Sequence, residues 1–358
     1  MSKPRLIAFY LPQFYPTQEN DEWWGRGFTE WTNVGKAKPL FKGHCQPRVP
    51  ADLGYYDLRV PEVRERQAKL AMEAGVEGFC YWHYWFAGKR LLDRVFNEVL
   101  ESGKPDFPFC LCWANHSWYK KTWLESKDDI LLIEQTYPGE EDYVRHFYEM
   151  LPAFKDKRYM KVDGKPIFGI YSPLSFDDFN NFKTTWNCLA KENGIEEFYF
   201  FGFMFSSQKI DVAKKMGFEN FVIDNIRGIH KRVNPVISLL HKMINSLSKK
   251  SWPYRYTYSE YIDTELLLLE VSENEHPCIL PNFDHSPRSG LNGKIIVGHS
   301  PEKWKYLCKE VFRRCKGRNN NIVFIKAWNE WGEGNYLEPD MAFGKQFIKA
   351  TKEALEEF

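Results

Sequence analysis

The sequence predicts a (β/α)8 barrel, in which eight parallel strands are surrounded by helices and followed by long loops. Eight short apolar runs recur along the 358 residues, and helical patterns separate most of them. The runs are continuously hydrophobic rather than alternating, as is typical of parallel strands covered by helices. A doubly wound open sheet is the alternative, but Leu11-Pro12-Gln13 after the first run is not the glycine-rich phosphate turn of that fold.

Each expected element has a local signal in the sequence. The expected strands are, in order, residues 6–11, 76–85, 107–113, 166–171, 198–205, 221–226, 278–283 and 322–325. Between and after them, helices are expected at residues 61–74, 92–100, 143–151, 179–194, a short stretch ending at 217, 301–312 and 346–357. Pro61 and Gly75 mark the two ends of the first helix, and Ser300 with Pro301 is typical of a helix start.

A basic insertion at residues 227–275 interrupts this alternation before the seventh strand. Two helical patterns are expected within it, around residues 236–247 and 259–271. Such a segment most often forms helices on the protein surface that are exposed to solvent. The alternative is a lid, or a surface for a lipid-linked glycan near a membrane. Because this length is ordinary for one barrel with insertions, residues 1–358 are expected to form a single domain.

Composition excludes several classes of protein. The net charge of +1 gives no reason to expect a nucleic-acid partner. The first residues contain only a short apolar run broken by Pro12, without the pattern of a signal peptide. The eight cysteines form no CxxC pair and are expected to be reduced, which favours a cytoplasmic protein. Aromatic residues make up 17% of the chain, more than a core alone requires.

Polar side chains follow five of the expected strands at their C-terminal ends, where barrel enzymes place their active sites. These residues are Gln13, His83, Asn115, His116, Asp284, Arg288, Glu330 and Glu333. Aromatic residues lie beside them. The recurrence predicts one polar pocket with aromatic walls.

The last of these segments, Asn321 to Asp340, carries the strongest signal. Its apolar strand ends in Trp-Asn-Glu-Trp-Gly-Glu-Gly, which places Glu330 and Glu333 three residues apart. The two glycines allow a sharp turn, so both carboxylates can point into one pocket. Two carboxylates beside aromatic surface are the minimum equipment of a glycoside-cleaving site. The alternative is a charged loop whose tryptophans pack into the core.

Six segments together resemble the WbsX-like family. They are IAFYLPQF, DEWWGRGFTEWTNV, GFCYWHYWF, WANHSW, PNFDHSPR and AWNEWGEGNYLEP, and the resemblance covers nearly the whole chain. That family is found with bacterial surface-polysaccharide biosynthesis genes and is often labelled glycosyltransferase. It is similar in turn to glycoside hydrolase family 99, the endo-α-mannosidases and endo-α-mannanases. This second likeness is narrower and rests mainly on WNEWGEG and the aspartate-to-arginine segment.

The resemblance to the hydrolases implies a mechanism. Glu330 would act as base on the sugar's own 2-hydroxyl, which attacks C1 and forms a 1,2-anhydro sugar. Glu333 would protonate the leaving oxygen and then deprotonate water, so that configuration is retained. This scheme requires an ionised Glu330 and a protonated Glu333. We expect the indoles of Trp328 and Trp331 to raise the pKa of Glu333 by desolvation.

Further residues are expected to contact the sugar. Asp284 and Arg288 match the hydrolase segment, although a salt bridge between the two is the alternative. The DEWW and FTEW segments are part of the resemblance to the WbsX-like family and not of the resemblance to the hydrolases. For His83 and His116, a contact with the sugar and a purely structural place in the pocket are equally expected. The complete expected substrate-binding set is Tyr10, Trp24, Glu30, Trp31, His83, Asn115, His116, Asp284, Arg288, Trp328, Asn329 and Trp331.

The leading functional hypothesis is a retaining, endo-acting glycoside hydrolase for an α-linked bacterial surface polysaccharide or its precursor. The alternatives are a glycosyltransferase or transglycosylase in O-antigen or capsule biosynthesis, and a non-catalytic glycan-binding protein. No DxD, GxGxxG or HExxH motif occurs, so neither a metal nor a cofactor is expected. The expected partner is an oligosaccharide or polysaccharide, and the patterns specify no oligomeric state.

Overall fold

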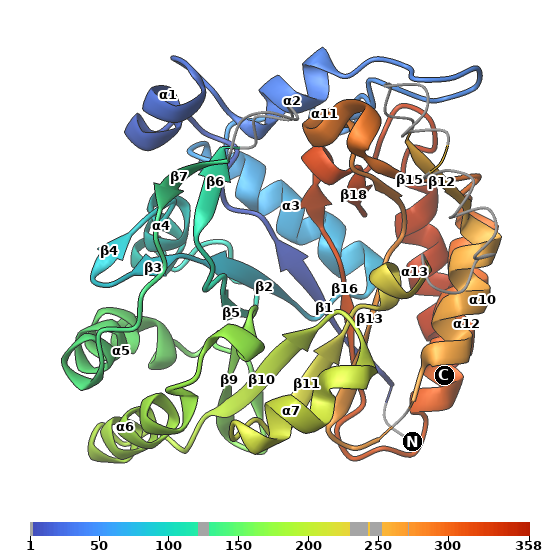
Figure 1. The fold of residues 1–358 in the computed structure, drawn as a ribbon. Helices are drawn as coiled ribbons and strands as arrows, with labels where there is room; N and C mark the ends of the chain where they lie inside the picture. The colour runs from blue at the N-terminus through green and yellow to red at the C-terminus, as the bar shows by residue number, and fades with distance from the viewer. Residues whose placement is uncertain (1–2, 121–128, 230–242, 244–252, 271) are drawn as a thin grey trace.

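Eight parallel strands form a closed barrel (Figure 1) in the computed structural model, which describes residues 3–120, 129–229, 243, 253–270 and 272–358. The strands are β1 (Arg5–Tyr10), β2 (Gly78–His83), β5 (Phe109–Trp113), β9 (Lys165–Ile170), β10 (Tyr199–Met204), β11 (Asn220–Ile223), β13 (Glu275–Ile279) and β16 (Ile322–Ile325). Their spatial order is β10-β11-β13-β16-β1-β2-β5-β9, and pairing between β9 and β10 closes the ring. The predicted (β/α)8 barrel is confirmed, and every barrel strand overlaps a predicted one.

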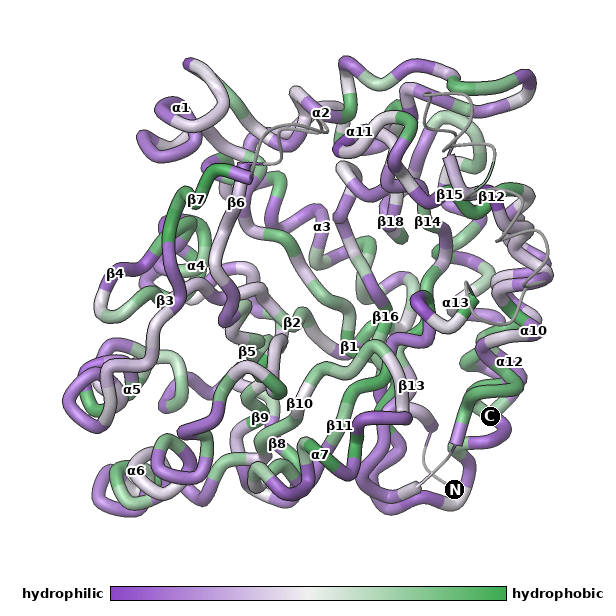
Figure 2. Tube along the Cα trace, viewed as in Figure 1, coloured by the Kyte–Doolittle hydropathy of each residue, from purple (hydrophilic) through white to green (hydrophobic). Residues whose placement is uncertain are grey.

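Aromatic rings fill the barrel interior. Phe9 stacks on Trp82 with 4.6 Å between ring centroids, and it lies 5.4 Å from both Phe203 and Phe324. Hydrophobic residues accordingly follow β1, β11 and β16 through the centre of Figure 2. A Cβ at Gly169 would overlap the Phe201 ring, so glycine there makes room for the large side chains of the neighbouring strand.

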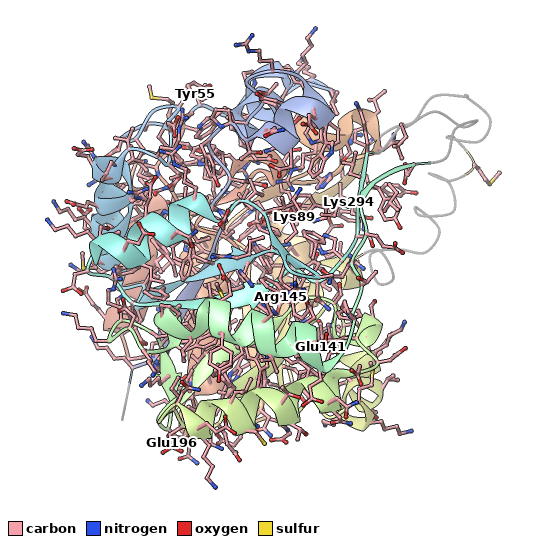
Figure 3. The ribbon with its side chains drawn as sticks, turned by 90° about the vertical axis from the view of Figure 1, so that its left-hand side faces the viewer. Tyr55, Lys89, Glu141, Arg145, Glu196 and Lys294 are labelled. Carbon is pink, nitrogen blue, oxygen red and sulfur yellow. The ribbon has the colours of Figure 1, made fainter. Side chains whose placement is uncertain are left out.

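Helices cover the outside of the barrel, one after each strand. They are α3 (Pro61–Ala74), α4 (Arg94–Ser102), α5 (Glu140–Phe154), α6 (Phe179–Glu192), α7 (Ile210–Lys215), α10 (Tyr258–Leu268), α12 (Pro301–Cys315) and α13 (Gln346–Glu356). Their ends follow the sequence signals: the Ser300 hydroxyl accepts the Lys303 amide, and Gly75 ends α3 at a φ of 79°. Charged side chains such as Glu141 and Arg145 of α5 face solvent (Figure 3).

Short elements are added at the C-terminal ends of the strands. The loop after β1 holds α1 (Gln18–Trp24) and α2 (Glu30–Lys36), and hairpins follow β2 and β5. These hairpins pair β3 (Trp85–Phe86) with β4 (Lys89–Arg90), and β6 (Trp118–Lys120) with β7 (Ile130–Ile133). The short helix α11 (Ser286–Ser289) follows β13, and β17 (Asn329–Glu330) pairs with β18 (Asn335–Tyr336) after β16. Elements α1, α2 and α11 gather at the top of Figure 1.

The insertion is described only in part. Its first predicted helix, around residues 236–247, lies outside the described residues apart from position 243. The second predicted helix corresponds to α10. Before it, β12 (Tyr254–Thr257) pairs with β15 (Lys294–Val297), and β15 pairs with β14 (Phe283–Asp284). The insertion is thus tied to the segment that leads into α11. Among the described residues, no helix has the length and apolarity needed to cross a membrane.

Candidate active site

A cavity of about 650 Å³ opens at the C-terminal ends of the barrel strands. Its polar lining includes Gln13, Glu30, His116, His285, Arg288, Lys326, Glu330 and Glu333. Its aromatic lining consists of Trp23, Trp24, Phe28, Trp82, Tyr84, Trp118, Tyr119 and Tyr171. Cavities of this size commonly enclose organic ligands. The predicted combination of polar and aromatic groups therefore exists at the predicted end of the barrel.

The segment after β16 brings both candidate catalytic glutamates into this cavity. The Trp328 amide donates to the Phe9 carbonyl at 2.7 Å, which holds the segment against the end of β1. The β17–β18 hairpin then reverses the chain, and Gly334 adopts a left-handed φ of 51° at the turn. Because of this turn, Glu330 and Glu333 line the same cavity, as the glycine spacing predicted.

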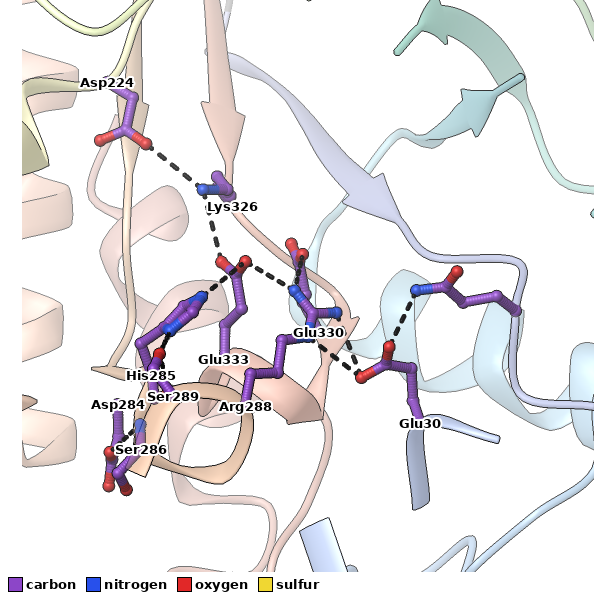
Figure 4. A network of polar contacts seen from close by, with 11 residues as sticks. Glu30, Asp224, Asp284, His285, Ser286, Arg288, Ser289, Lys326, Glu330 and Glu333 are labelled. Carbon is purple, nitrogen blue, oxygen red and sulfur yellow. Dashed lines mark hydrogen bonds and ion pairs between the residues drawn. The ribbon is translucent and has the colours of Figure 1, made fainter. Parts of the chain in front are cut away.

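Arg288 of α11 joins three carboxylates of the pocket, Glu30, Glu330 and Glu333, which we call the carboxylate cluster (Figure 4). Its Nη1 donates to Glu333 Oε1 at 2.7 Å and lies 3.5 Å from Glu330 Oε1. Its Nε donates to Glu30 Oε2 at 3.2 Å. The other oxygen of Glu30 accepts from the Gln13 side-chain amide at 3.2 Å. Residues from the loops after β1, β13 and β16 therefore meet at one guanidinium.

Gly332 allows Glu30 and Arg288 to lie this close to the segment that carries the two glutamates. A Cβ at this position would overlap Glu30 Oε2 and would lie 2.9 Å from Arg288 Nε. The glycine between the two candidate glutamates is therefore required for close approach, in addition to any role in the turn.

A buried lysine faces the carboxylate oxygen of Glu333 that Arg288 does not contact. Lys326 directly follows β16, and its Nζ lies 3.8 Å from Glu333 Oε2 and 3.5 Å from Asp224 Oδ2. His285 Nε2 lies 3.6 Å from Glu333 Oε1. Glu333 thus faces three basic groups, whereas Glu330 has one ion-pair partner, Arg288, and its Oε2 accepts no hydrogen bond within the described residues.

This asymmetry gives the two glutamates different pKa values. Burial and the charge of Glu333 raise the pKa of Glu330 to about 7. Burial acts in the same direction on Glu333, but Lys326, Arg288 and His285 outweigh it and hold the pKa of Glu333 far below its usual range. The expected order, an ionised Glu330 and a protonated Glu333, is wrong for this structure because the basic groups surround Glu333.

The expected desolvation by Trp328 and Trp331 is also absent, because neither indole lines the cavity. Trp328 is fully buried and packs against Phe79. Trp331 stacks on Tyr336 at 3.7 Å and donates to the buried carboxylate of Glu338 at 2.6 Å. Both rings anchor the segment that carries the glutamates.

The structure divides the expected substrate-binding residues into two groups. Those that line the cavity are Trp24, Glu30, His116 and Arg288. Those that do not are Tyr10, Trp31, His83, Asn115, Asp284, Trp328, Asn329 and Trp331. Most of the second group are buried and hydrogen-bonded to the scaffold. Their side chains support the pocket rather than face it.

Asp284 illustrates this supporting role. It is fully buried and accepts hydrogen bonds from His44 and Gln46, both at 2.7 Å, and from the Ser286 amide at 3.0 Å. Burial would raise its pKa, but these bonds and the charge of Arg48 lower it far below the usual range. Asp284 neither faces the cavity nor pairs with Arg288, so both expectations for it fail. It fixes the start of α11, which carries Arg288.

The other supporting residues are held in similar ways. Asn329 bonds both backbone groups of Leu11, at 2.7 and 3.0 Å, and so ties the site segment to the end of β1. Asn115 donates to the Tyr137 hydroxyl and the Ser172 carbonyl. The remaining hydrogen bonds join Tyr10 to Gln67, Trp31 to the Tyr56 carbonyl, and His83 to His146.

Sequence reasoning missed Lys326, His285, Tyr84 and Tyr171 as pocket residues. A signal existed for Lys326, since it is the first residue after the eighth strand. His285 lies inside the PNFDHSPR segment, three residues before Arg288. Among the described residues, no group of three or more His, Cys, Asp or Glu side chains has an arrangement suited to a metal ion.

Comparison with solved structures identifies proteins that share this fold. The chain resembles a glycoside hydrolase-like protein at 16% identity, with a TM-score of 0.61 over 99% of this chain and 94% of that one. It also resembles the GH99 endo-alpha-mannosidase from Bacteroides thetaiotaomicron at 13% identity, with a TM-score of 0.53 over 99% of this chain and 97% of that one. At these identities the likeness concerns the fold. The chain therefore shares the (β/α)8 barrel fold of these proteins.

Sequence comparison gives the family. The sequence model of the family described as Glycosyltransferase WbsX matches residues 6–351. The chain is 34% identical over 364 residues to the protein WxcX of Xanthomonas campestris pv. campestris (strain B100), covering 98% of this chain and 49% of the relative. It matches the WxcX of strain ATCC 33913 at the same identity over 369 residues. The chain belongs to the WbsX family, and it spans about half the length of these curated relatives.

Proposed function

We propose that the protein is a retaining, endo-acting glycoside hydrolase that acts on an α-linked bacterial surface polysaccharide or its precursor. The observation that carries this proposal is the paired contact of Glu330 and Glu333 with one guanidinium nitrogen, at 3.5 and 2.7 Å. The two contacting oxygens cannot be further apart than these distances added together. Both carboxylates can therefore reach one anomeric centre, as glycoside cleavage by two carboxylates requires.

The charges of the pocket support a division of roles in which Glu330 donates the proton and Glu333 acts as base. Glu333 takes the proton of the sugar's 2-hydroxyl as O2 bonds to C1. At the same time the bond from C1 to the leaving oxygen breaks, and Glu330 protonates that oxygen. In the second step Glu330 takes a proton from water as the water oxygen bonds to C1. The bond from C1 to O2 breaks, and Glu333 returns its proton to O2. Two displacements at C1 give net retention.

The aromatic lining supports a glycan as the ligand. Trp23 and Trp118 meet edge to face at 5.8 Å between centroids, and Trp24 lies 5.8 Å from Phe28 at the cavity. Aromatic faces pack well against the apolar C–H faces of sugar rings, while the carboxylate cluster supplies acceptors for hydroxyl groups. A lining that extends from the glutamates to the loop tips suits a chain of sugars and therefore endo-acting cleavage.

Sugar transfer is the second candidate, because the family itself is described as a glycosyltransferase. The same pocket could pass the sugar to an acceptor hydroxyl instead of water, which would make the enzyme a transglycosylase. A lipid-linked precursor would then be an expected partner for the basic insertion at residues 227–275.

A single assay separates these functions. The purified protein is incubated with α-linked manno-oligosaccharides and α-linked bacterial polysaccharides, with and without nucleotide sugars, and the products are analysed by mass spectrometry. We expect shortened glycans, and a loss of at least 100-fold in rate for Glu330→Gln and for Glu333→Gln. The matched control is Glu196→Gln, since this exposed glutamate lies on the outer surface (Figure 3). Transfer from a nucleotide sugar that survives both changes would overturn the hydrolase proposal, and glycan binding without turnover would indicate a binding protein.

A further inference from the structure

Lys326 is a buried charge that the proposed reaction does not use directly. Its side chain is 8% exposed, and its ammonium group lies between Asp224 and Glu333 (Figure 4). Attraction to these carboxylates outweighs the effect of burial and raises the pKa of Lys326 beyond its usual range. The ammonium group is therefore charged at every pH at which the protein would be assayed.

Asp224 holds this ammonium group in place through an ion pair. It follows β11 directly, is fully buried, and accepts the Ile226 amide at 2.9 Å through Oδ1, which leaves Oδ2 facing Lys326. Behind it, Asn225 donates to Glu265, whose pKa burial raises to about 8. Burial raises the pKa of Asp224 as well, but the adjacent Lys326 ammonium favours its ionised form, so Asp224 is the carboxylate of this pair that faces Lys326.

The charged groups around the two candidate catalytic glutamates are distributed unequally. Glu333 is faced by Lys326 from the end of β16, by Arg288 and His285 from α11 and the residue before it, by Glu330 from β17, and by Tyr171 from the end of β9. Glu330 is faced by Arg288, Lys326, Glu333, Glu30 of α2, Tyr84 after β2 and also Tyr171. Arg288 forms ion pairs with both glutamates. Of these two glutamates, Lys326 lies within 4.0 Å of Glu333 alone.

We propose that Lys326, anchored by Asp224, is a positioning residue that keeps Glu333 ionised and so places the dissociable proton of the pair on Glu330. A cation shared by both carboxylates favours the ionised form of each. A cation close to one of them makes that carboxylate the stronger acid. Lys326 therefore acts together with Arg288 and His285, which also lie against Glu333, to make Glu333 the stronger acid of the pair. This inference rests on the proposed function only where it calls the pair catalytic, because the position of the proton can be measured without a substrate.

The test follows the side-chain carboxyl signals of ¹³C-labelled glutamates by NMR as the pH is varied from 5 to 9. The signals of Glu330 and Glu333 are assigned by their loss in Glu330→Gln and Glu333→Gln, and those of Glu265 and Glu338 in the same way, since these two also titrate near neutral pH. In the wild-type protein we expect the Glu330 signal to carry the titration step near pH 7, while the Glu333 signal stays in its ionised position.

Removing the lysine charge is expected to change this pattern. In Lys326→Met the two carboxylates compete more equally for one proton, so both signals should move across the same pH range. Lys326→Arg keeps the charge and should preserve the wild-type pattern. The control is Lys349→Met, which removes the charge of a lysine that is 77% exposed on α13 and should leave the titration unchanged.

Two results would overturn the proposal. The first is a wild-type protein in which Glu333 already takes part in the step near pH 7. The second is a Lys326→Met protein in which the step stays entirely on Glu330, because Arg288 and His285 would then determine the position of the proton without Lys326. If Lys326→Met does not fold, Lys326→Gln removes the charge but keeps a hydrogen-bonding group, and the same outcomes apply. An inactive protein with the expected titrations would contradict the proposed function but not this inference.

Discussion

Two polar clusters lie at the C-terminal ends of the barrel strands, and they differ in charge. The carboxylate cluster joins Glu30, Glu330 and Glu333 through Arg288 at the edge of the cavity. The second cluster, at the end of β2, is neutral and closed. There His83 and His146 share one hydrogen bond of 2.7 Å between their Nε2 atoms, and His146 stacks on Trp85 at 4.5 Å.

The comparison shows how a charged cluster beside the cavity differs from a neutral cluster in the core of this fold. Each carboxylate of the first cluster faces other charges, so the position of every proton depends on its neighbours. The histidines of the second cluster are surrounded by rings, and burial lowers both of their pKa values well below the usual range. Two neutral imidazoles can satisfy each other, because one donates and the other accepts. The charged cluster that opens to the cavity is therefore the candidate site, whereas the paired histidines are part of the core.

The largest effect is expected from removing the shared cation of the carboxylate cluster. Arg288→Met leaves three carboxylates close together without their common partner, which should lower the free energy of unfolding by about 3 kcal/mol or more at pH 8. Because protonation relieves the repulsion, the loss should be smaller at pH 5. Urea unfolding at the two pH values measures both quantities.

The matched control for this change is Arg313→Met. Arg313 pairs with Glu310 on the solvent-facing side of α12, and its side chain is 60% exposed, so its loss should cost well under 1 kcal/mol. Equal losses for Arg288→Met at pH 5 and pH 8 would contradict the interpretation that the carboxylate cluster is held together by charge.

The neutral cluster should respond to pH in a different way. The pKa values of His83 and His146 are depressed in the folded protein, whereas in the unfolded chain both bind protons below about pH 6.5. Their contribution to stability is thus complete above pH 6.5 and is lost as the pH falls, by about 1.4 kcal/mol per pH unit for each histidine.

Substitution isolates this contribution from the other buried groups. His146→Phe should lower stability by about 1 to 3 kcal/mol at pH 7.5, because His83 loses its partner. The free energy of unfolding should also depend less on pH between pH 5 and 6.5, because one of the two histidines no longer contributes. Chemical denaturation across this range measures the slope, with Tyr148→Phe, an exposed position on the same helix, as control. An unchanged slope would show that His146 is not neutral in the folded protein.

A smaller effect is expected at the glycine that lets the carboxylate cluster close. In Gly332→Ala the new Cβ must displace the ends of Glu30 and Arg288, which can move, so the cost in stability should be about 1 kcal/mol. Activity should fall more strongly, by about tenfold or more, because the geometry of the pocket changes. Gly35→Ala in α2 meets no atom within 4 Å and should leave activity unchanged. Equal activities for the two variants would contradict the role of Gly332 in close approach.

The smallest effect is expected at the aromatic rim of the cavity. Trp24 is 42% exposed, so Trp24→Ala should leave stability nearly unchanged. It should weaken binding of an α-linked manno-oligosaccharide several-fold, by removing a stacking surface. Calorimetric titration of the inactive Glu330→Gln background measures this, with Tyr306→Ala on the outer helix α12 as control. Identical affinities would exclude Trp24 from the binding surface.

The barrel and the two glutamates were predictable from the sequence because they depend on local patterns. Apolar runs define the strands, and the glycines beside Glu333 define the turn. The orientation of a single side chain was not predictable in the same way. Asp284 and Arg288 lie four residues apart, yet one turns into the core toward His44 and the other into the cavity, and this choice depends on loops more than 200 residues away.

The charge states were misjudged for a related reason. Their order depends on Lys326 and His285, which carry no motif of their own and matter only because the fold brings them within 4 Å of Glu333. A pKa follows from the surroundings of a group in three dimensions. The sequence around a glutamate describes only a small part of those surroundings.

The pairing of β1 with β16 has a consequence for how the protein acquires its pocket. These strands come from opposite ends of the barrel sequence, and their register aligns Leu6 with Val323. Glu30 and Glu333, which both contact Arg288, come from the two sides of this seam. A chain caught part-way through folding, with the ring still open, would hold both residues and yet have no pocket. Formation of the pocket would thus report ring closure, and fluorescence changes in the pocket tryptophans would time that event during refolding.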